Sequence, residues 1–251
     1  MEPSEKLMER DPLFQIHHPT TCLIAGPTGC GKSKFVSRII HSLMLKSGAM
    51  IEPRPTRIIW VYSEWQSIYV ELEGKKEELG FAIEFVKFTA TNLNELYDKF
   101  TPSETNLIIL DDLMSSSSPS QKKQILQLFT QGSHHRNLTI IYLVQNLFDQ
   151  GPSSRAISLN AQYIVVFKNP RDSAQIGFLA QQAFPKNPKF LDEAYQDATR
   201  SPHTYLVLNL TQECEDWFRV VTQVFPGEDL EVYLQNEQVL PDDLLYKGQF
   251  W

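Results

Sequence analysis

The sequence predicts an α/β fold in which helices flank a mostly parallel central sheet. Short, almost wholly apolar runs recur along the chain, and between them lie longer segments whose apolar residues repeat at helical spacing. The chain has 251 residues, 42% of them hydrophobic and 21% charged, which suits one large domain with a buried core. Strands that alternate with helices pair in parallel, because each crossover helix packs back onto the sheet.

The expected strands are short apolar runs, except that residues 81–88 alternate apolar and polar side chains as a half-buried strand does. In chain order they are 21–25, 57–62, 81–88, 106–110, 138–144, 163–167, 205–210 and 218–225.

The first expected helix begins at Lys32, because the apolar residues from Phe35 to Met44 recur at helical spacing up to a stop near Gly48. The later helices are expected at 66–79, 93–100, 121–131, 173–183 and 190–199, with a polar, serine-rich loop at 115–120. We expect a lead-in segment at 1–19, one domain at 20–226 and an acidic tail with an aromatic end at 227–251.

Residues 24–33 carry the most specific pattern in the chain. Gly26, Gly31, Lys32 and Ser33 satisfy the spacing Gly-x4-Gly-Lys-Ser/Thr, with an expected strand before it and an expected helix after it. Glycines let the backbone turn so that successive N–H groups face phosphate oxygens, and the helix adds its positive end. The loop therefore predicts a nucleoside triphosphate site made by Gly26, Pro27, Thr28, Gly29, Cys30, Gly31, Lys32 and Ser33.

Within this loop two side chains have chemical roles. Lys32 is expected to reach the β- and γ-phosphates of ATP, and the Ser33 hydroxyl is expected to bind Mg²⁺. Cys30 is either an oxidation-sensitive thiol near a helix N-terminus or a tolerated small residue, and we favour the second.

The acidic half of the site is expected at the end of the strand 106–110. Asp111 follows this apolar strand and is assigned to water-mediated Mg²⁺ contact. Asp112 is the candidate general base that polarises the attacking water, and its alternative role is to cap the next segment. Glu64 is a reserve candidate for the base, although an exposed glutamate after a strand is more often a surface residue.

Three other positions complete the candidate catalytic set. Gln145 follows the strand 138–144 and is expected to orient water and report the nucleotide state; otherwise its amide fixes a loop. An arginine from a neighbouring subunit often neutralises charge on the γ-phosphate, and Arg136 is our first candidate and Arg155 our second. Arg171 is a third, and each arginine can equally be a surface cation.

Charge and cysteine content limit the classes of function. The net charge of −7 and the pI near 5.4 argue against a nucleic-acid-coated protein, but they leave room for a ring that gathers a few cations into a pore. Three cysteines form no disulfide framework or metal-ligand pattern. No apolar run approaches the roughly 20 residues that span a bilayer, and residues 1–5 lack a signal core. We expect an intracellular protein without a membrane segment.

Several blocks resemble one family of motor proteins. The segments 128–137, 142–148, 157–160 and 167–172, with His134-His135-Arg136-Asn137, Gln145-Asn146 and Asn169-Pro170-Arg171-Asp172, resemble the genome-packaging ATPases of Maverick/Polinton elements and adintovirus-like viruses. These are related to the poxvirus-type packaging ATPases in the FtsK–HerA superfamily. The resemblance runs from about Thr21 to about Leu210.

The resemblance implies a RecA/FtsK-like P-loop NTPase that hydrolyses ATP as a homo-oligomeric ring, a pentamer or hexamer. Such a ring would pump double-stranded DNA, independent of its sequence, into a preformed capsid at a portal vertex. Gly26 to Ser33 match the phosphate loop, Asp111 and Asp112 the acidic motif, and Gln145 the sensor. Much of the superfamily has glutamate where Asp112 stands, so the shorter carboxylate makes its role as base less secure.

The same resemblance implies a place and further contacts. The protein is expected in the nucleus or cytoplasm of an infected host cell, or associated with virions. Lys122 and Lys123 are candidate DNA contacts in the pore or ordinary solvated lysines, and the tail 227–251 either docks on a capsid protein or is disordered.

Other nucleotide-dependent functions remain as alternatives. A small-molecule kinase needs a lid with several arginines, and a GTP-binding protein usually has Asn-Lys-x-Asp; the sequence has neither. A cellular or conjugative FtsK-like DNA translocase shares the same ATPase core, and a non-motor nucleotide-binding switch shares the loop. The lack of a membrane segment and of a DNA-reading domain favours packaging over the cellular translocase.

Overall fold

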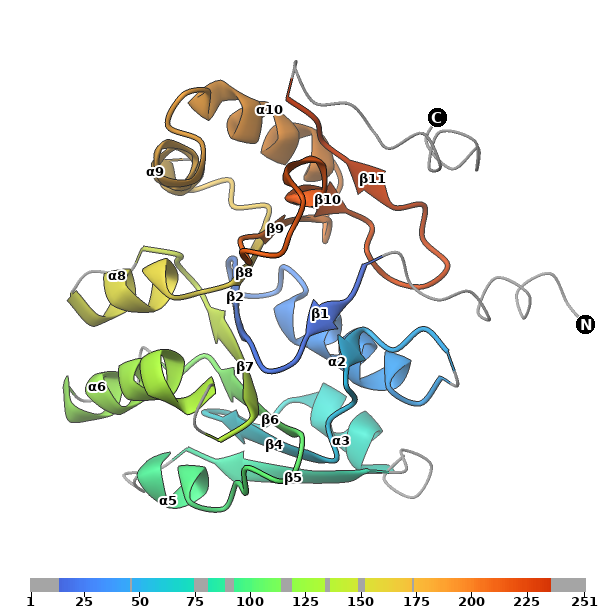
Figure 1. Cartoon of the computed structure of the whole chain (residues 1–251), viewed down its shortest axis with the longest axis vertical. Coiled ribbons are helices and arrows are strands. Elements are labelled where there is room, and N and C mark those ends of the chain that lie inside the picture. Colours follow the sequence, from blue (N-terminus) through green and yellow to red (C-terminus); the bar gives the residue numbers. More distant parts are fainter. Residues whose placement is uncertain are drawn as a thin grey trace, which may run out of the picture.

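The computed structural model describes residues 14–45, 47–74, 81–88, 93–113, 119–133, 136–148, 152–172 and 174–235. These residues form a nine-stranded sheet in the order β11-β10-β9-β8-β2-β7-β6-β4-β5 (Figure 1). A separate parallel pair joins β1 (Ile16–His17) to β3 (Ile51–Glu52). The expected α/β fold with a mostly parallel central sheet is confirmed.

Six neighbouring strands of the large sheet run in parallel. They are β2 (Thr21–Ala25), β4 (Arg57–Tyr62), β5 (Ala82–Lys87), β6 (Asn106–Asp111), β7 (Leu138–Val144) and β8 (Tyr163–Phe167). Their carboxyl ends therefore meet at one edge of the sheet. Three further strands, β9 (Tyr205–Asn209), β10 (Val220–Thr222) and β11 (Glu231–Val232), continue the sheet beside β8 in antiparallel pairs.

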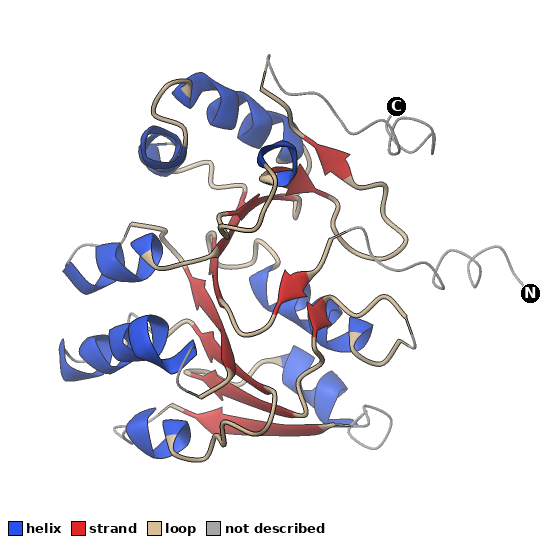
Figure 2. Ribbon diagram, viewed as in Figure 1, coloured by secondary structure: helices blue, strands red, loops and turns tan. Residues whose placement is uncertain are grey.

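Helices cover both faces of the sheet (Figure 2). One face carries α2 (Lys32–Ser42) and α3 (Ser67–Gly74). The other carries α5 (Leu93–Tyr97), α6 (Pro119–Gln127), α8 (Pro152–Leu159), α9 (Ala174–Ala183) and α10 (Pro188–Ala198), and α6 continues into a π-helical turn at Leu128–Gly132. A 3₁₀ turn at Asp216–Phe218 precedes β10.

Alternation of side chains along the strands divides the core in two. Leu23 and Ala25 of β2 face the α5–α10 side, whereas Cys22 and Ile24 face the α2–α3 side, and the other central strands do the same. Because both faces are covered, the central strands are buried throughout and read in the sequence as continuous apolar runs.

Three elements differ from the expected ones for local reasons. The first helix ends at Ser42, whose hydroxyl donates to the Ile39 carbonyl and accepts from the Met50 amide, and the chain turns there rather than near Gly48. The expected strand 218–225 shortens to Val220–Thr222, and Gln223 follows at φ 54°. Helix α8 was not expected, because it is only eight residues long and begins with Pro-Ser-Ser, which is typical of a loop.

The packed domain extends past 20–226 on both sides. Phe14 is 1% exposed, and Ile16 pairs with Ile51. At the other end Val232 pairs with Val221, so β11 belongs to the sheet. The rest of the expected lead-in and tail, 1–13 and 236–251, and the serine loop at 115–118 lie outside the described residues.

Among the described residues, none of the helices combines the length and the apolar character that a membrane crossing needs.

Candidate nucleotide site

The loop 26–31 leaves the carboxyl end of β2, between the ends of β7 and β8. Gly31 has φ 114°, a conformation that side-chain-bearing residues rarely adopt. A Cβ at Gly26 would lie 2.7 Å from both Phe167 Cβ and Cys30 Sγ. Glycine is therefore required at 26 by the close approach of β8 and at 31 by backbone conformation.

The Lys32 side chain lies against this loop. Its Nζ donates to the carbonyl oxygens of Gly26 at 2.6 Å and Pro27 at 3.2 Å, and the residue is 9% exposed. An ammonium has three N–H donors and can exchange such partners for phosphate oxygens. The loop thus holds a cation where the sequence predicts triphosphate binding.

Asp111 joins the loop to the acidic strand. Its Oδ2 accepts from Ser33 Oγ at 3.2 Å, from Tyr69 Oη at 2.6 Å and from Trp60 Nε1 at 3.3 Å. Burial raises the pKa of the Asp111 carboxyl, while the hydrogen bonds from Tyr69, Ser33 and Trp60 and the charge of Lys32 oppose that rise. The two residues assigned to Mg²⁺, Ser33 and Asp111, are therefore in direct contact.

Sequence reasoning missed Tyr69 and Trp60. Trp60 lies on β4 next to β6, and Tyr69 lies on α3, forty-two positions before Asp111 in the chain. Both are wholly buried, and burial raises the pKa of the Tyr69 phenol strongly. No local pattern marks either residue, because each is brought to Asp111 by packing of distant elements.

Gln145 and Asp112 form a second pair at the same edge. Strand β7 lies between β2 and β6, so Gln145 at its tip stands between the phosphate loop and the acidic strand. Gln145 Nε2 donates to Asp112 Oδ2 at 2.7 Å. Asp112 has φ 52°, and its amide donates to the Leu143 carbonyl at 3.2 Å, so backbone and side chain are both fixed to β7.

The candidate arginines lie at different edges. Arg136 precedes β7 at the amino edge, opposite the phosphate loop, and its guanidinium contacts Asp98 at 3.4 Å and the Phe100 carbonyl at 3.4 Å. Within its own chain Arg136 is thus remote from the loop. Arg155 is exposed in the first turn of α8, which begins near the carboxyl edge, and Arg171 is exposed in the connection after β8.

The remaining candidates are placed as follows. Glu64 is exposed two residues after β4, whose Tyr62 pairs with Asp111, so it shares the carboxyl edge. Burial raises the pKa of the Cys30 thiol more than nearby Lys32 lowers it, which is the opposite of what a reactive thiolate needs. Lys122 and Lys123 lie on α6.

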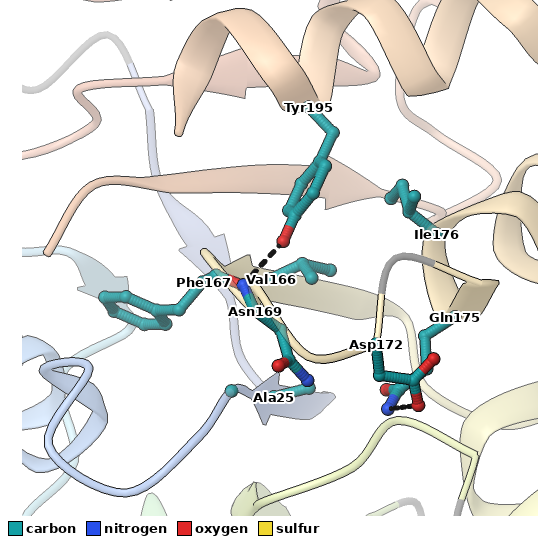
Figure 3. Close-up of a pocket in the computed structure, with 9 residues that line it drawn as sticks. Ala25, Val166, Phe167, Asn169, Asp172, Gln175, Ile176 and Tyr195 are labelled. Atoms are coloured by element: carbon teal, nitrogen blue, oxygen red, sulfur yellow. Dashed lines mark hydrogen bonds between the residues drawn. The ribbon is translucent and has the colours of Figure 1, made fainter. Parts of the chain in front are cut away.

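A pocket borders the loop on the β8 side (Figure 3). Tyr195 reaches it from α10; its hydroxyl donates to the Phe167 carbonyl at 3.1 Å and accepts from the Asn169 amide at 2.9 Å. The figure also shows Asp172 and Gln175 side by side, joined by a 2.6 Å hydrogen bond. The pocket is lined by Ala25, Gly26, Val166, Phe167, Asn169, Asp172, Gln175, Ile176 and Tyr195.

Gln175 links this pocket to the Gln145 turn. Its Oε1 accepts from the Leu147 amide at 2.7 Å, and its Nε2 donates to Asn146 Oδ1 at 3.2 Å as well as to Asp172. The blocks Gln145-Asn146 and Asn169-Pro170-Arg171-Asp172, which are separate in the sequence, are therefore adjacent in space. Gln175 itself carried no sequence signal.

Comparisons with known proteins agree with this fold. Two solved structures superpose at TM-score 0.51 and 13% identity: the cytoplasmic domain of the Type VII secretion ATPase EccC of Thermomonospora curvata, and ATPases 2 and 3 of EssC of Geobacillus thermodenitrificans. They match 89% and 92% of this chain and 26% and 42% of their own. No protein-family model matches the chain.

One curated protein is similar in sequence. The ATP-binding cassette transporter abc4 of Schizosaccharomyces pombe is 24% identical over an alignment of 198 positions, which covers 64% of this chain and 13% of the transporter. The chain thus spans less than half the length of each of these proteins.

Fold, loop and comparisons together define the class: the chain has the α/β fold of RecA/FtsK-like P-loop ATPases. None of the three names mentions genome packaging, so that expectation stays a prediction.

Proposed function

We propose that this protein binds ATP with Mg²⁺ and hydrolyses it to ADP and phosphate. The observation that carries the proposal is the 3.2 Å contact between Ser33 Oγ and Asp111 Oδ2, which brings the phosphate loop and the acidic strand into one site. A hydroxyl and a carboxylate at this spacing are oxygen ligands of the kind Mg²⁺ prefers. Positive φ at Gly29 and Gly31 fits a loop whose N–H groups bind phosphate oxygens.

The residues divide the work of binding. The loop from Gly26 to Ser33 would hold the phosphates through its backbone N–H groups, except at Pro27, which has none, and at Gly26, whose N–H donates to the Val144 carbonyl at 3.2 Å. Lys32 would pair with the β- and γ-phosphates. Ser33 would bind Mg²⁺ directly, and Asp111 would bind it through water. Bound Mg²⁺ supplies positive charge that neutralises the phosphate oxygens.

Asp112 is the proposed general base. Its carboxylate accepts the proton of the attacking water, and the amide of Gln145, 2.7 Å from Asp112 Oδ2, fixes the direction in which that carboxylate points. Glu64 is the reserve candidate and is a second carboxylate at this edge. The variants Asp112→Asn and Glu64→Gln distinguish these two candidates. Neutralising the residue that acts as the base should lower kcat by about 10²-fold or more, whereas neutralising the other carboxylate should not.

Steady-state ATP hydrolysis tests the proposal directly. Wild-type protein with Mg²⁺ is expected to release phosphate, and Lys32→Ala is expected to abolish release. ATP binding without turnover, under conditions where DNA is also supplied, would instead favour the nucleotide-binding switch.

We further propose that hydrolysis drives a homo-oligomeric ring, a pentamer or hexamer, that moves double-stranded DNA into a preformed capsid. The support is the resemblance of the blocks around Arg136, Gln145 and Arg171 to packaging ATPases. On this proposal the protein acts in the nucleus or cytoplasm of an infected cell or on the virion, and a capsid or portal protein is its docking partner. A cellular or conjugative DNA translocase is the second candidate.

DNA dependence tests the motor. Contacts to DNA phosphates are independent of sequence and weaken with salt, so double-stranded DNA is expected to stimulate ATP hydrolysis and the stimulation is expected to fade as salt rises. If DNA leaves the rate of ATP hydrolysis unchanged at every salt concentration, the translocation proposal is contradicted and the ATPase proposal stands.

A further inference from the structure

A histidine outside the sequence motif touches the phosphate loop. His203 lies in the connection between α10 and β9, and its Nδ1 is 3.1 Å from the carbonyl oxygen of Cys30. A carbonyl oxygen only accepts hydrogen bonds, so Nδ1 carries a proton and donates it here. A Cβ built on Gly31 would lie 3.8 Å from both Cβ and Nδ1 of His203, which places the His203 side chain beside Gly31.

The sheet brings His203 to this position. Strand β9 is antiparallel to β8, with Tyr205 opposite Phe167, so β9 begins at the edge where β8 ends. Strand β8 in turn lies next to β2, from which the phosphate loop leaves. The residues just before β9 therefore lie beside the loop, although they are far from it in sequence.

The connection is held in shape by its own contacts. Lys168 Nζ donates to the Arg200 carbonyl at 2.9 Å, and Thr204 Oγ1 donates to the Ser201 carbonyl at 2.8 Å. His203 itself has φ 65°, in the left-handed region that residues with side chains use sparingly. A strained conformation persists when its surroundings enforce it, and here it aims the imidazole at the loop.

We propose that His203 is a positioning residue that holds the phosphate loop in its phosphate-binding shape. A trans peptide is planar, so the Cys30 carbonyl and the Gly31 N–H point in opposite directions. A donor that holds the carbonyl therefore aims the Gly31 N–H at the opposite side of the loop, the side assigned to the phosphates. This inference rests on the proposed ATP binding and adds to it a residue from another element.

Two substitutions separate the hydrogen bond from the backbone conformation. Asparagine tolerates positive φ, and its Nδ2 is attached to Cγ as Nδ1 is in histidine, so His203→Asn keeps the donor. Glycine also accepts positive φ but has no donor, so His203→Gly removes the bond without backbone strain. His17→Ala is the matched control, because His17 is exposed on β1, away from the loop.

The test is calorimetric measurement of the dissociation constants of ATP and of tripolyphosphate, both with Mg²⁺. We expect His203→Gly to raise the dissociation constants of both ligands by about fivefold, which is the effect of losing one hydrogen bond. The dissociation constants of His203→Asn should stay near those of wild-type protein. Both ligands should weaken equally because the loop contacts phosphates only. In turnover, KM should rise by the same factor while kcat changes less.

Each other outcome overturns the inference. Unchanged affinities in His203→Gly would show that the hydrogen bond does not shape the loop. Weakening of ATP alone would mean that His203 contacts the nucleoside instead. Equal losses in His203→Asn and His203→Gly would show that the donor is irrelevant. If wild-type protein binds neither ligand, the proposed function fails, which is distinct from a failure of the His203 variants alone.

Discussion

At the scale of single residues, Asp111 shows a conflict between stability and function. A buried carboxylate is costly to ionise, and the three donors on its Oδ2 only partly offset the burial, so its pKa in the folded protein is raised. The proposed binding of Mg²⁺ nonetheless needs the charged form of Asp111, because carboxylate ligands bind Mg²⁺ in their ionised form. The hydrogen bonds from Tyr69, Trp60 and Ser33 lower the cost of ionising this buried carboxyl group.

Asp111→Asn is expected to stabilise the nucleotide-free protein. When an acidic group has a higher pKa in the folded protein than in the unfolded chain, the protein loses stability as pH rises between these two pKa values. Wild-type protein carries that cost at pH 7, whereas the variant, which has no group to ionise at this position, does not, so the Tm of the variant should be higher. The difference should shrink toward pH 4. Melting curves across this range check it, and a lower Tm at pH 7 would contradict it.

A second prediction at this scale concerns Gly26. Gly26→Ala would place a Cβ 2.7 Å from Phe167 Cβ, which belongs to a buried strand and cannot yield cheaply. We expect ATP binding to fall by about tenfold or more through displacement of the loop. Gly177→Ala is the matched control: outside the backbone of α9 itself no atom lies within 4 Å of the added Cβ, and alanine in the interior of α9 should raise stability by about 0.5–1 kcal/mol. Equal ATP affinity in both variants would contradict the prediction.

At the scale of elements, Gln175 ties the turn after β7 to helix α9. One amide makes hydrogen bonds to Leu147, Asn146 and Asp172, and Phe148 of the same turn packs edge-on against Phe178 of α9 at 6.2 Å between ring centroids. Since Gln145 begins that turn, any shift of Gln145 with the state of the nucleotide would be passed to α9.

Gln175→Ala is therefore expected to act on turnover more than on binding. The Gln145 turn would lose its anchor, so kcat should fall by about fivefold while KM changes little. Gln181→Ala, an exposed glutamine on the same helix, should match wild type. Steady-state kinetics of the two variants decide the question, and an effect confined to KM would show that Gln175 supports binding instead.

At the scale of the whole molecule, the sequence predicts the sheet better than the site. Central strands such as β6 and β7 are buried on both faces, so their positions follow from apolar runs alone. The loop 26–33 follows from motif spacing, and Asp111 was placed beside it because it ends an apolar strand. Tyr69, Gln175 and His203 do not, because each reaches the site through tertiary packing that no local pattern encodes. Helix α8 was missed because it is only eight residues long and begins with Pro-Ser-Ser, which is typical of a loop.

In the proposed ring, one arginine of each subunit would reach the nucleotide site of the next subunit. Arg136 lies opposite the loop and is engaged with Asp98, whereas Arg155 is exposed near the carboxyl edge. We therefore expect Arg155 to act across the subunit interface of the proposed ring. Mixing Lys32→Ala subunits with Arg155→Ala subunits tests this expectation. The first kind of subunit keeps an intact arginine and the second keeps an intact phosphate loop, so a complete site can form only between the two kinds.

Each variant alone should be inactive, and equal amounts mixed before assembly should recover roughly a quarter of the wild-type ATPase rate. Half of the loops are then intact, and half of those face an intact arginine. A mixture of Lys32→Ala with Arg136→Ala subunits should show no ATPase activity beyond the sum of the rates of the two variants measured alone. Recovery with Arg136→Ala instead would place the interface at the amino edge of the sheet, and recovery with neither would mean that Arg155 and Arg136 do not act between subunits.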